Sequence, residues 1–207
     1  RITDHAMLDV VTMVYGGLVN KNIVATLQSL NSNAIGLTGA DAGLIRAHKR
    51  PVNDKVDPVI DYGFVGDIDA VNGKQLTAFL KNKLLPIIAP LTFDPTLGVM
   101  LNTNADTMAS AVAVGLSEFY DVNLVYCFEK NGVLLDADND DTVIPVLTPE
   151  LYATCKTAGA IYKGMIPKLD NAFAALRNGV AEVTICHADQ LGLALTKKTA
   201  GTKLTLG

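Results

Sequence analysis

The segment Leu101-Asn-Thr-Asn-Ala-Asp106 marks a junction between a strand and a helix. The apolar residues before it predict a short strand that runs into Asn102. From Asn104 to about Glu118 the chain is rich in alanine, valine and glycine, which predicts a helix packed closely against a sheet. Val122–Phe128 then predicts a second, buried strand. A strand, a helix and a strand in this order indicate an α/β fold.

Outside this segment, buried strands and helices continue to alternate. Leu84–Leu91 is apolar at both odd and even positions, which predicts a central strand buried on both faces. Near the start, Thr3 is the expected N-cap of a helix that begins near Asp4, with a kink or break at Gly16-Gly17. We therefore expect a single domain over residues 1–207, with helices on both faces of a mainly parallel sheet.

Three further elements follow from local patterns. Asn72 is the expected cap of a short helix that ends near Lys81. Thr148-Pro149-Glu150 predicts the start of another helix, because proline is favoured at the first position of a helix. Val183–Cys186 predicts a strand in the last part of the chain.

Composition narrows the class of protein. Of 207 residues, 49% are hydrophobic and 18% are charged, which suits a well-filled core. The formal net charge of −4 argues against nucleic acid as a partner, because phosphate binding requires a basic face. The three cysteines are widely spaced, which fits a reducing cytoplasm rather than a disulfide framework. The longest apolar runs, such as Leu84–Leu91, are too short to span a bilayer, so no membrane partner is expected.

Several motif templates for cofactor and metal sites fail. The chain has neither the G-x-x-x-x-G-K-[ST] loop nor the G-x-G-x-x-G loop that hold nucleotides in other folds. Asp136–Asp141 begins like a calcium loop, but it lacks the glycine at the sixth position and the closing glutamate. The three histidines show no metal-ligand spacing. We therefore expect no protein-bound metal.

Three short segments remain as candidates for chemistry. In Leu101–Asp106, the side chains of Asn102 and Asn104 share one face of an extended chain. Asp106 falls in the first helical turn, where the helix dipole stabilises a carboxylate. The alternative is an ordinary helix cap.

The second candidate runs from Gly159 to Lys168, which falls in the first turn of another helix. A cation there opposes the helix dipole, which suggests a compensating anion such as a phosphate. The alternative is a solvated surface lysine. The third candidate, Phe128–Leu134, follows a buried strand, and its Lys-Asn-Gly turn is compatible with a nucleotide edge or with a plain turn.

At these segments the sequence resembles the amino acid kinase family, in its acetylglutamate kinase branch, and the match runs from Arg1 to Gly207. The details of Met13–Gly17 and Val125–Lys130 resemble relatives from Bacteroidetes-type bacteria. The family motifs stand in order: Gly36-Leu-Thr-Gly39, Gly63-Phe-Val-Gly66, Asn102-Thr-Asn-Ala-Asp106, Gly164-Met-Ile-Pro-Lys168 and Gly201-Thr202.

The resemblance implies a three-layer α/β/α sandwich and a cytoplasmic, ATP-dependent kinase of arginine biosynthesis. Its acceptor would be the γ-carboxylate of N-acetyl- or N-succinyl-L-glutamate, and Mg²⁺ would arrive with ATP. Lys168 would neutralise charge on the transferring phosphoryl group, and Asp106 would orient catalytic lysines. Arg1 and Asn102 would hold the α-carboxylate, with Asn104 also at the substrate. The expected ATP site comprises Glu129, Lys130, Asn131, Gly132, Val133, Leu134, Ala160, Ile161, Tyr162 and Gly164.

The resemblance also carries a departure and two alternatives. The family has a Lys-x-Gly-Gly strand end and a glycine-triplet loop, which we expect in residues that precede Arg1, so this chain alone should not be an efficient kinase. The fold is shared with carbamate, glutamate and aspartate kinases, and a non-catalytic ligand-binding regulatory domain remains the other alternative. A homodimer is implied through a helix like that at Asp4–Leu30.

Overall fold

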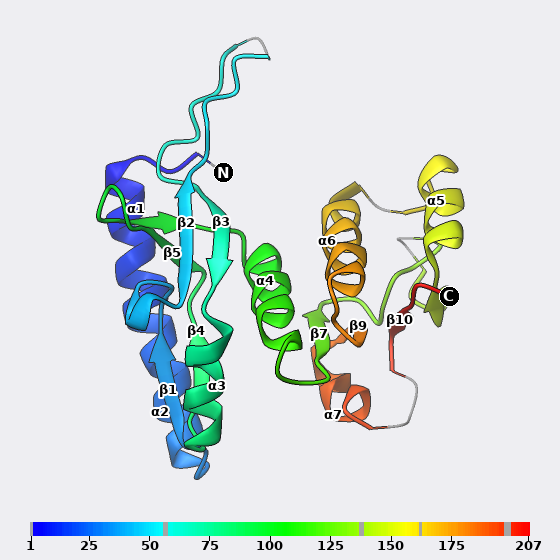
Figure 1. The fold of residues 1–207 in the computed structure, drawn as a ribbon. Helices are drawn as coiled ribbons and strands as arrows, with labels where there is room; N and C mark the ends of the chain where they lie inside the picture. The colour runs from blue at the N-terminus through cyan, green and yellow to red at the C-terminus, as the bar shows by residue number, and fades with distance from the viewer. Residues whose placement is uncertain (1, 56–57, 137–138, 162, 197–199) are drawn as a thin grey trace. The chain divides into compact units, whose positions relative to one another are not determined.

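The structure, a computed structural model, describes residues 2–55, 58–136, 139–161, 163–196 and 200–207. The chain folds into two compact units, Arg1–Leu116 and Ser117–Gly207 (Figure 1). The single domain expected from the sequence stays a prediction.

Unit 1 begins with a continuous helix made of three parts. These are α1 (His5–Val11), the π-helical η1 (Thr12–Val19) and α2 (Asn20–Ser29). Asp4, and not Thr3, caps α1, because its carboxylate accepts the N–H of Met7 at 2.8 Å. The predicted cap at Thr3 is therefore wrong. Gly16-Gly17 lies inside η1, where the helix continues with a wider winding.

The strands of unit 1 form two sheets. In the smaller sheet, β1 pairs in parallel with β4. The larger sheet has the order β3-β2-β5-β6, in which β2–β5 is parallel and the other two pairs are antiparallel. The strands are β1 (Ala34–Leu37), β2 (Ile45–Lys49), β3 (Gly66–Val71), β4 (Leu85–Ile88), β5 (Leu91–Asp94) and β6 (Val99–Asn102), and the remaining helices are η2 (Asp41–Gly43), α3 (Gly73–Lys81) and α4 (Ala105–Ser117).

The predicted central strand Leu84–Leu91 is wrong. The run divides at Ala89-Pro90 into β4 and the first residue of β5, which belong to different sheets. Pro90 has no N–H to give to a sheet ladder, so a proline at this point ends the pairing. The predicted helix after Asn72 is confirmed as α3, with the Asn72 side chain accepting the N–H of Gln75 at 3.0 Å.

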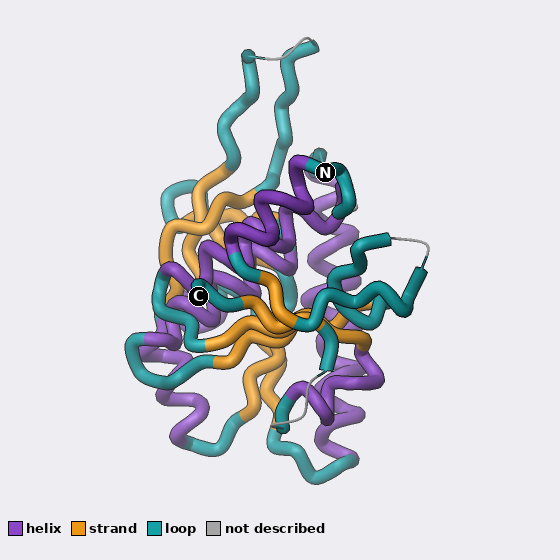
Figure 2. The backbone as a smooth tube through the Cα atoms, turned by 90° about the vertical axis from the view of Figure 1, so that its right-hand side faces the viewer, coloured by secondary structure: helices purple, strands orange, loops and turns teal. Residues whose placement is uncertain are grey.

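Helices cover both faces of the larger sheet. On one face, Leu8 and Val11 of α1 pack with Ala89 and Leu91. A separate cluster joins Ile45 of β2 to helices α3 and α4, and its buried members are Leu37, Leu44, Ile45, Leu76 and Met108. Figure 2 shows the strands and helices of this α/β arrangement along the backbone. The predicted α/β class is confirmed, although the larger sheet is mixed.

Asn20 and Lys21 tie the long helix to the smaller sheet. The buried Asn20 amide donates to the Ile87 carbonyl at 2.8 Å, and Lys21 Nζ donates to the Gly36 carbonyl at 3.0 Å. A Cβ on Gly36 would lie 1.9 Å from Asn20 Oδ1. The helix therefore approaches β1 so closely that only glycine fits there.

Much of the apolar surface of the long helix is exposed. The helix His5–Ser29 is long and apolar enough, by length and composition alone, to cross a membrane, and 11% of its most apolar window is buried within the protein. Its exposed apolar side chains are Met7, Val10, Met13, Leu18, Val19 and Ile23.

Unit 2 is a four-stranded sheet with helices around it. The strand order is β7-β9-β10-β8, with β7–β9 and β8–β10 parallel and β9–β10 antiparallel. Thr148 caps α5 as predicted, accepting the N–H of Leu151 at 3.3 Å. The elements are β7 (Asn123–Phe128), β8 (Val146–Leu147), α5 (Pro149–Thr157), η3 (Lys163–Met165), α6 (Ile166–Arg177), β9 (Glu182–His187), η4 (Ala188–Gln190), α7 (Leu191–Ala194) and β10 (Thr202–Leu204).

Candidate functional site

A cavity of about 710 Å³ in unit 1 contains the predicted polar segment. One wall comes from α1 and η1 and is mostly apolar, with Met7, Val10, Val11, Val14 and Tyr15. The polar lining includes residues from the end of β6 and the start of α4. The other lining residues are Ile2, Thr3, Arg50, Val65, Pro90, Asn102, Thr103, Asn104 and Ala105. Such a cavity suits a small ligand with one polar end and one apolar part.

Asn102 is the last residue of β6 and lines this cavity. Its Nδ2 donates to Thr3 Oγ1 at 3.0 Å, and its backbone N–H donates to the Phe64 carbonyl at 2.8 Å. The side chain is half-buried. Asn102 is therefore held at a fixed position beside the cavity, as a ligand-binding amide requires.

Asn104 lies two residues further on and caps α4. Its Oδ1 accepts the N–H of Thr107 at 3.0 Å, which is the ordinary capping contact. Asn104 is exposed and also lines the cavity, and capping occupies its oxygen rather than its Nδ2 group. Asp106 stands in the first turn of α4, as predicted. The substrate and catalytic roles of these residues stay predictions.

Two buried hydroxyls support the segment between the asparagines. Thr103 Oγ1 lies 2.8 Å from Thr92 Oγ1 and 3.5 Å from the Gly66 carbonyl. Gly66 admits no Cβ, which would lie 2.6 Å from Thr92 Oγ1. The polar segment therefore rests on a packed base of β3 and β5.

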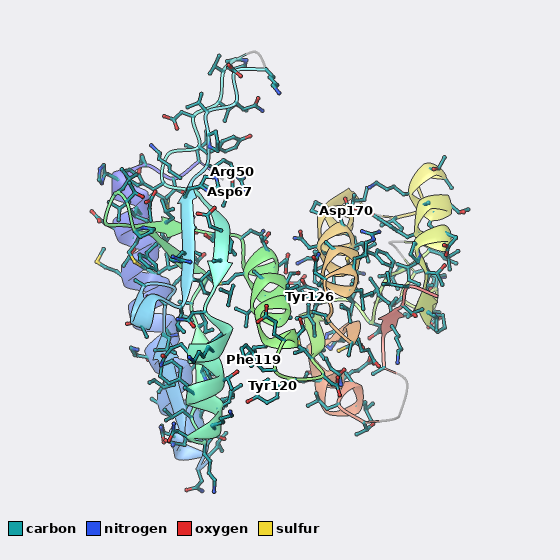
Figure 3. All side chains as sticks on the ribbon, viewed as in Figure 1. Arg50, Asp67, Phe119, Tyr120, Tyr126 and Asp170 are labelled. Atoms are coloured by element: carbon teal, nitrogen blue, oxygen red, sulfur yellow. The ribbon has the colours of Figure 1, made fainter. Side chains whose placement is uncertain are left out.

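Arg50 is a cavity residue that the sequence did not indicate. Arg50 and Asp67 are labelled in Figure 3. The Arg50 guanidinium binds Asp67 through Nε at 2.9 Å and Nη2 at 2.6 Å, and it lies 5.3 Å from the ring centre of Tyr62. The hydrogen bond to Asp67 raises the pKa of Arg50 above its ordinary value. The pairing joins β3 to the chain that follows β2. No local sequence pattern marks it, since the partners are 17 residues apart.

In unit 2, the predicted nucleotide loop follows β7. Gly132, Val133 and Leu134 are buried, whereas Glu129 is exposed. The loop is fixed by Thr202 Oγ1, which accepts the N–H of Val133 at 2.8 Å. Lys130 Nζ pairs with Asp140 at 3.0 Å on the surface, and Gln190 Nε2 donates to Asn131 Oδ1 at 3.5 Å. The loop is an irregular turn with a fixed backbone, which can present N–H and C=O groups to a ligand.

Lys168 lies in the first turn of α6, as predicted. Its ammonium is 5.3 Å from the ring centre of Phe128, the last residue of β7. This contact places Lys168 beside the start of the nucleotide loop. Unit 2 therefore brings together the two segments that the sequence assigned to phosphate and nucleotide.

A polar clamp fixes α6 against α5. Tyr152 Oη donates to Asp170 Oδ1 at 2.8 Å, and Lys156 Nζ donates to both Asp170 oxygens at 3.3 Å (Figure 3 labels Asp170). Burial raises the pKa of the Tyr152 hydroxyl, and the bond to Asp170 adds to this effect. Because Asp170 is two residues after Lys168, the clamp steadies the turn that carries the lysine.

Five predicted site residues remain to be placed. Ala160, Ile161 and Gly164 precede α6, and Ile161 is buried. Arg1 and Tyr162 lie outside the described residues. Asn102, Asn104 and Asp106 belong to unit 1, and Lys168 and the nucleotide loop to unit 2, so their meeting in one site stays a prediction.

Comparisons with known proteins identify the family. The model of the Amino acid kinase family matches residues 1–187. The chain is 54% identical to the acetylglutamate kinase of Cytophaga hutchinsonii over 99% of its own length and 76% of that protein. It is 56% identical to the acetylglutamate kinase of Phocaeicola vulgatus, over 92% of this chain and 72% of that protein.

Solved structures show the same fold. The protein smu.665 from Streptococcus mutans superposes with a TM-score of 0.78 at 29% identity, covering 100% of this chain and 75% of that one. The N-acetylglutamate synthase of Neisseria gonorrhoeae gives a TM-score of 0.81 at 22% identity, covering 100% of this chain and 45% of that one. With its matched motifs and its close relatives, the chain belongs to the amino acid kinase family, in the branch that comprises the acetylglutamate kinases.

Proposed function

We propose that this chain belongs to an enzyme that carries out the ATP-dependent phosphorylation of the γ-carboxylate of N-acetyl-L-glutamate, a step of arginine biosynthesis. The relatives that it matches over most of its length are acetylglutamate kinases. The observation that carries the proposal is the cavity of unit 1, which is lined both by the hydrogen-bonded amide of Asn102 and by apolar side chains of the first helix. These apolar side chains suit an acyl chain, and the amide suits the α-carboxylate.

The chemistry follows from the charges involved. An ionised carboxylate is already a nucleophile, so no general base is needed. Phosphoryl transfer then depends on positioning and on neutralising negative charge. In this proposal Lys168 supplies positive charge to the transferring phosphoryl group, and Asp106 orients the lysines of the site. Loop 129–134 holds the nucleotide, together with Ala160–Gly164.

Mg²⁺ enters the proposal with ATP. Among the residues that the structure describes, no three His, Cys, Asp or Glu side chains are grouped as a metal site would require. Mg²⁺ keeps several waters and binds readily to phosphate oxygens, so the nucleotide itself can carry it to the site.

The decisive experiment is an acceptor panel with coupled detection of ADP. The assay protein joins this chain to the Lys-x-Gly-Gly and glycine-triplet segments expected before Arg1. We expect N-acetylglutamate or N-succinylglutamate to be phosphorylated in preference to carbamate, glutamate and aspartate. ADP release with carbamate or aspartate alone would replace the proposal with another kinase of the fold. ATP binding without turnover of any acceptor would favour a regulatory domain.

The acyl group is decided by the same assay. A comparison of kcat/KM for N-acetylglutamate and N-succinylglutamate gives the preference directly. The higher value identifies the preferred acyl group.

We also propose a cytoplasmic homodimer that packs through the long first helix. Met13 and Leu18 are 64% and 61% exposed, which is unusual for large apolar side chains that serve no interface. Light scattering should give twice the monomer mass, and Met13→Lys with Leu18→Lys should give the monomer mass. Co-sedimentation of the unchanged protein with phosphatidylcholine vesicles would instead favour a membrane as the partner of this helix.

A further inference from the structure

Thr3 is fully buried although its side chain is polar. Its Oγ1 accepts a hydrogen bond from Asn102 Nδ2 at 3.0 Å. The two residues are 99 positions apart in the sequence, so neither a helix cap nor a turn explains the contact. Buried polar groups are generally hydrogen-bonded, and the partner of this hydroxyl is an amide that lines the cavity.

The backbone of Thr3 is fixed on both sides by one segment. Its N–H donates to the Tyr62 carbonyl at 3.0 Å, and its carbonyl accepts the N–H of Phe64 at 2.7 Å. Between them Gly63 has a φ of 66°, and a Cβ on it would lie 2.1 Å from the Thr3 carbonyl oxygen. Only glycine therefore allows this approach, which places Thr3 at a defined depth beside the cavity.

The same segment also fixes Asn102. The carbonyl of Phe64 accepts the backbone N–H of Asn102 at 2.8 Å. Residues 62–64 thus hold the backbones of both Thr3 and Asn102. The hydrogen bond between Asn102 Nδ2 and Thr3 Oγ1 joins the side chains of the same two residues. The position of the Thr3 hydroxyl relative to the Asn102 amide is consequently determined by backbone contacts.

The hydrogen bond to Thr3 decides how the amide can act. An asparagine amide has two N–H groups and one oxygen, and its two ends exchange places when it rotates by half a turn. A hydroxyl can accept from the nitrogen end of an amide or donate to its oxygen end. In the structure the Thr3 hydroxyl accepts from Nδ2, and among the described residues the second N–H of Nδ2 has no other hydrogen-bond partner. A carboxylate accepts from N–H and not from an amide oxygen, so this orientation is the one that an anionic ligand needs.

We propose that Thr3 is a positioning residue for the acceptor, and that its hydroxyl orients the Asn102 amide toward the α-carboxylate. This inference rests on the proposed function. Thr3 touches no reacting atom. Its effect is expected on acceptor binding, with little effect on the transfer step, because the α-carboxylate is bound equally before and during transfer.

The test compares three variants in the assay protein. Thr3→Val has the same shape without the hydroxyl and should raise KM for N-acetylglutamate about five- to tenfold, with kcat changed less than about twofold. KM for ATP should not change. Thr3→Ser keeps the hydroxyl and should restore KM to within about twofold of the parent. Thr77→Val is the matched control, because Thr77 is also buried but its hydroxyl has no partner among the described residues.

A double-mutant cycle separates positioning from general stability. If Thr3 acts through Asn102, adding Thr3→Val to Asn102→Ala should raise KM no further than Asn102→Ala alone. Additive effects would contradict the inference, as would an unchanged KM in Thr3→Val or a Thr3→Ser variant as impaired as Thr3→Val. If thermal unfolding shows that Thr3→Val does not fold, Thr3→Ala takes its place in the same cycle.

The outcome also distinguishes this inference from the proposed function. Parent protein that phosphorylates no acylglutamate would overturn the function itself. Active parent protein with an unchanged KM in Thr3→Val would overturn only the role of Thr3.

Discussion

The backbone N–H of Val133 donates to Thr202 Oγ1 at 2.8 Å, and both residues are buried. This hydrogen bond joins the loop that follows β7 to the first residue of β10, which comes 69 positions later. Gly132 allows this close approach, because a Cβ at position 132 would lie 2.7 Å from Thr202 Oγ1. The proposed nucleotide loop is thus shaped by the end of the chain.

We predict that Thr202→Val weakens both stability and nucleotide binding. The substitution leaves a buried N–H without a partner, which costs about 1–3 kcal/mol of unfolding free energy. KM for ATP should rise while KM for the acceptor stays unchanged. Urea unfolding and steady-state kinetics measure the two effects, and Thr202→Ser serves as the control that keeps the hydroxyl. An equal rise in both KM values would show that the loop has no specific link to the nucleotide.

The second prediction compares the loss of stability in Gly63→Ala with that in Gly98→Ala. Gly63 and Gly98 have nearly the same φ, 66° and 67°, but a Cβ on Gly98 would meet no atom within 4 Å. Gly98→Ala should therefore cost only the left-handed backbone strain of about 1–2 kcal/mol. Gly63→Ala adds the collision with the Thr3 carbonyl and should cost roughly 3 kcal/mol or more.

Urea denaturation of the two alanine variants gives the comparison directly. Gly63→Ala should also raise KM for the acceptor, because it displaces Thr3 and with it the Asn102 amide. Equal stability losses in the two variants would mean that the Thr3–Gly63 contact is looser than the structure has it.

Asp106 and Lys168 should be needed for turnover but not for folding. Asp106→Asn and Lys168→Met in the assay protein should each lower kcat by about 10²–10³-fold, the range seen when one electrostatic contact to a transition state is removed. Thermal unfolding should confirm that both variants fold. Lys203→Met removes a surface lysine paired with Glu182 and should leave kcat unchanged. Near-parental turnover in both site variants would exclude the proposed roles.

Asp94 gives a prediction about pH. The backbone N–H of Leu97, together with that of Thr96, holds the pKa of the Asp94 carboxyl below its usual value. A carboxyl with a lowered folded-state pKa stabilises the protein above its unfolded value, about 3.9, and this stability is lost as pH falls through the folded-state pKa.

The comparison variant is Asp94→Asn, which cannot ionise. Its melting temperature should lie below that of the parent near pH 7, and the difference should vanish toward pH 2. Melting temperatures measured at intervals across this range give the result. A difference that stays constant with pH would show that the Asp94 charge contributes nothing to the turn before β6.

The sequence predicts structure best where that structure depends on neighbouring residues. The junction Leu101–Asp106, the caps at Asn72 and Thr148 and the helix around Lys168 all follow from patterns a few residues long. The strands predicted at Val122–Phe128 and Val183–Cys186 are also confirmed as β7 and β9, and apolar residues dominate both segments. The predicted burial of the first is wrong, because only Tyr126 of β7 is buried.

Prediction fails where distant segments decide the outcome. Thr3 has the side chain of a helix cap, but its contacts with residues 62–64 and Asn102 hold it ahead of the helix, and Asp4 caps instead. Leu84–Leu91 is almost uniformly apolar, so the sequence does not show where it divides into two strands. The division is visible only in the structure, where β4 pairs with β1 and β5 pairs with β6. The Arg50–Asp67 pair and β8, which has two residues, leave no periodic signal at all.

The contact between Gly36 and Asn20 limits the order in which this sequence can change. The three heavy atoms nearest to a Cβ on Gly36 would all belong to the side chains of Asn20 and Lys21. A side chain at position 36 would therefore expel a buried amide, whereas the loss of Asn20 would open room for it. Relatives that carry alanine at the position of Gly36 should carry a smaller residue at that of Asn20, and ancestral sequences should show that the asparagine was lost first.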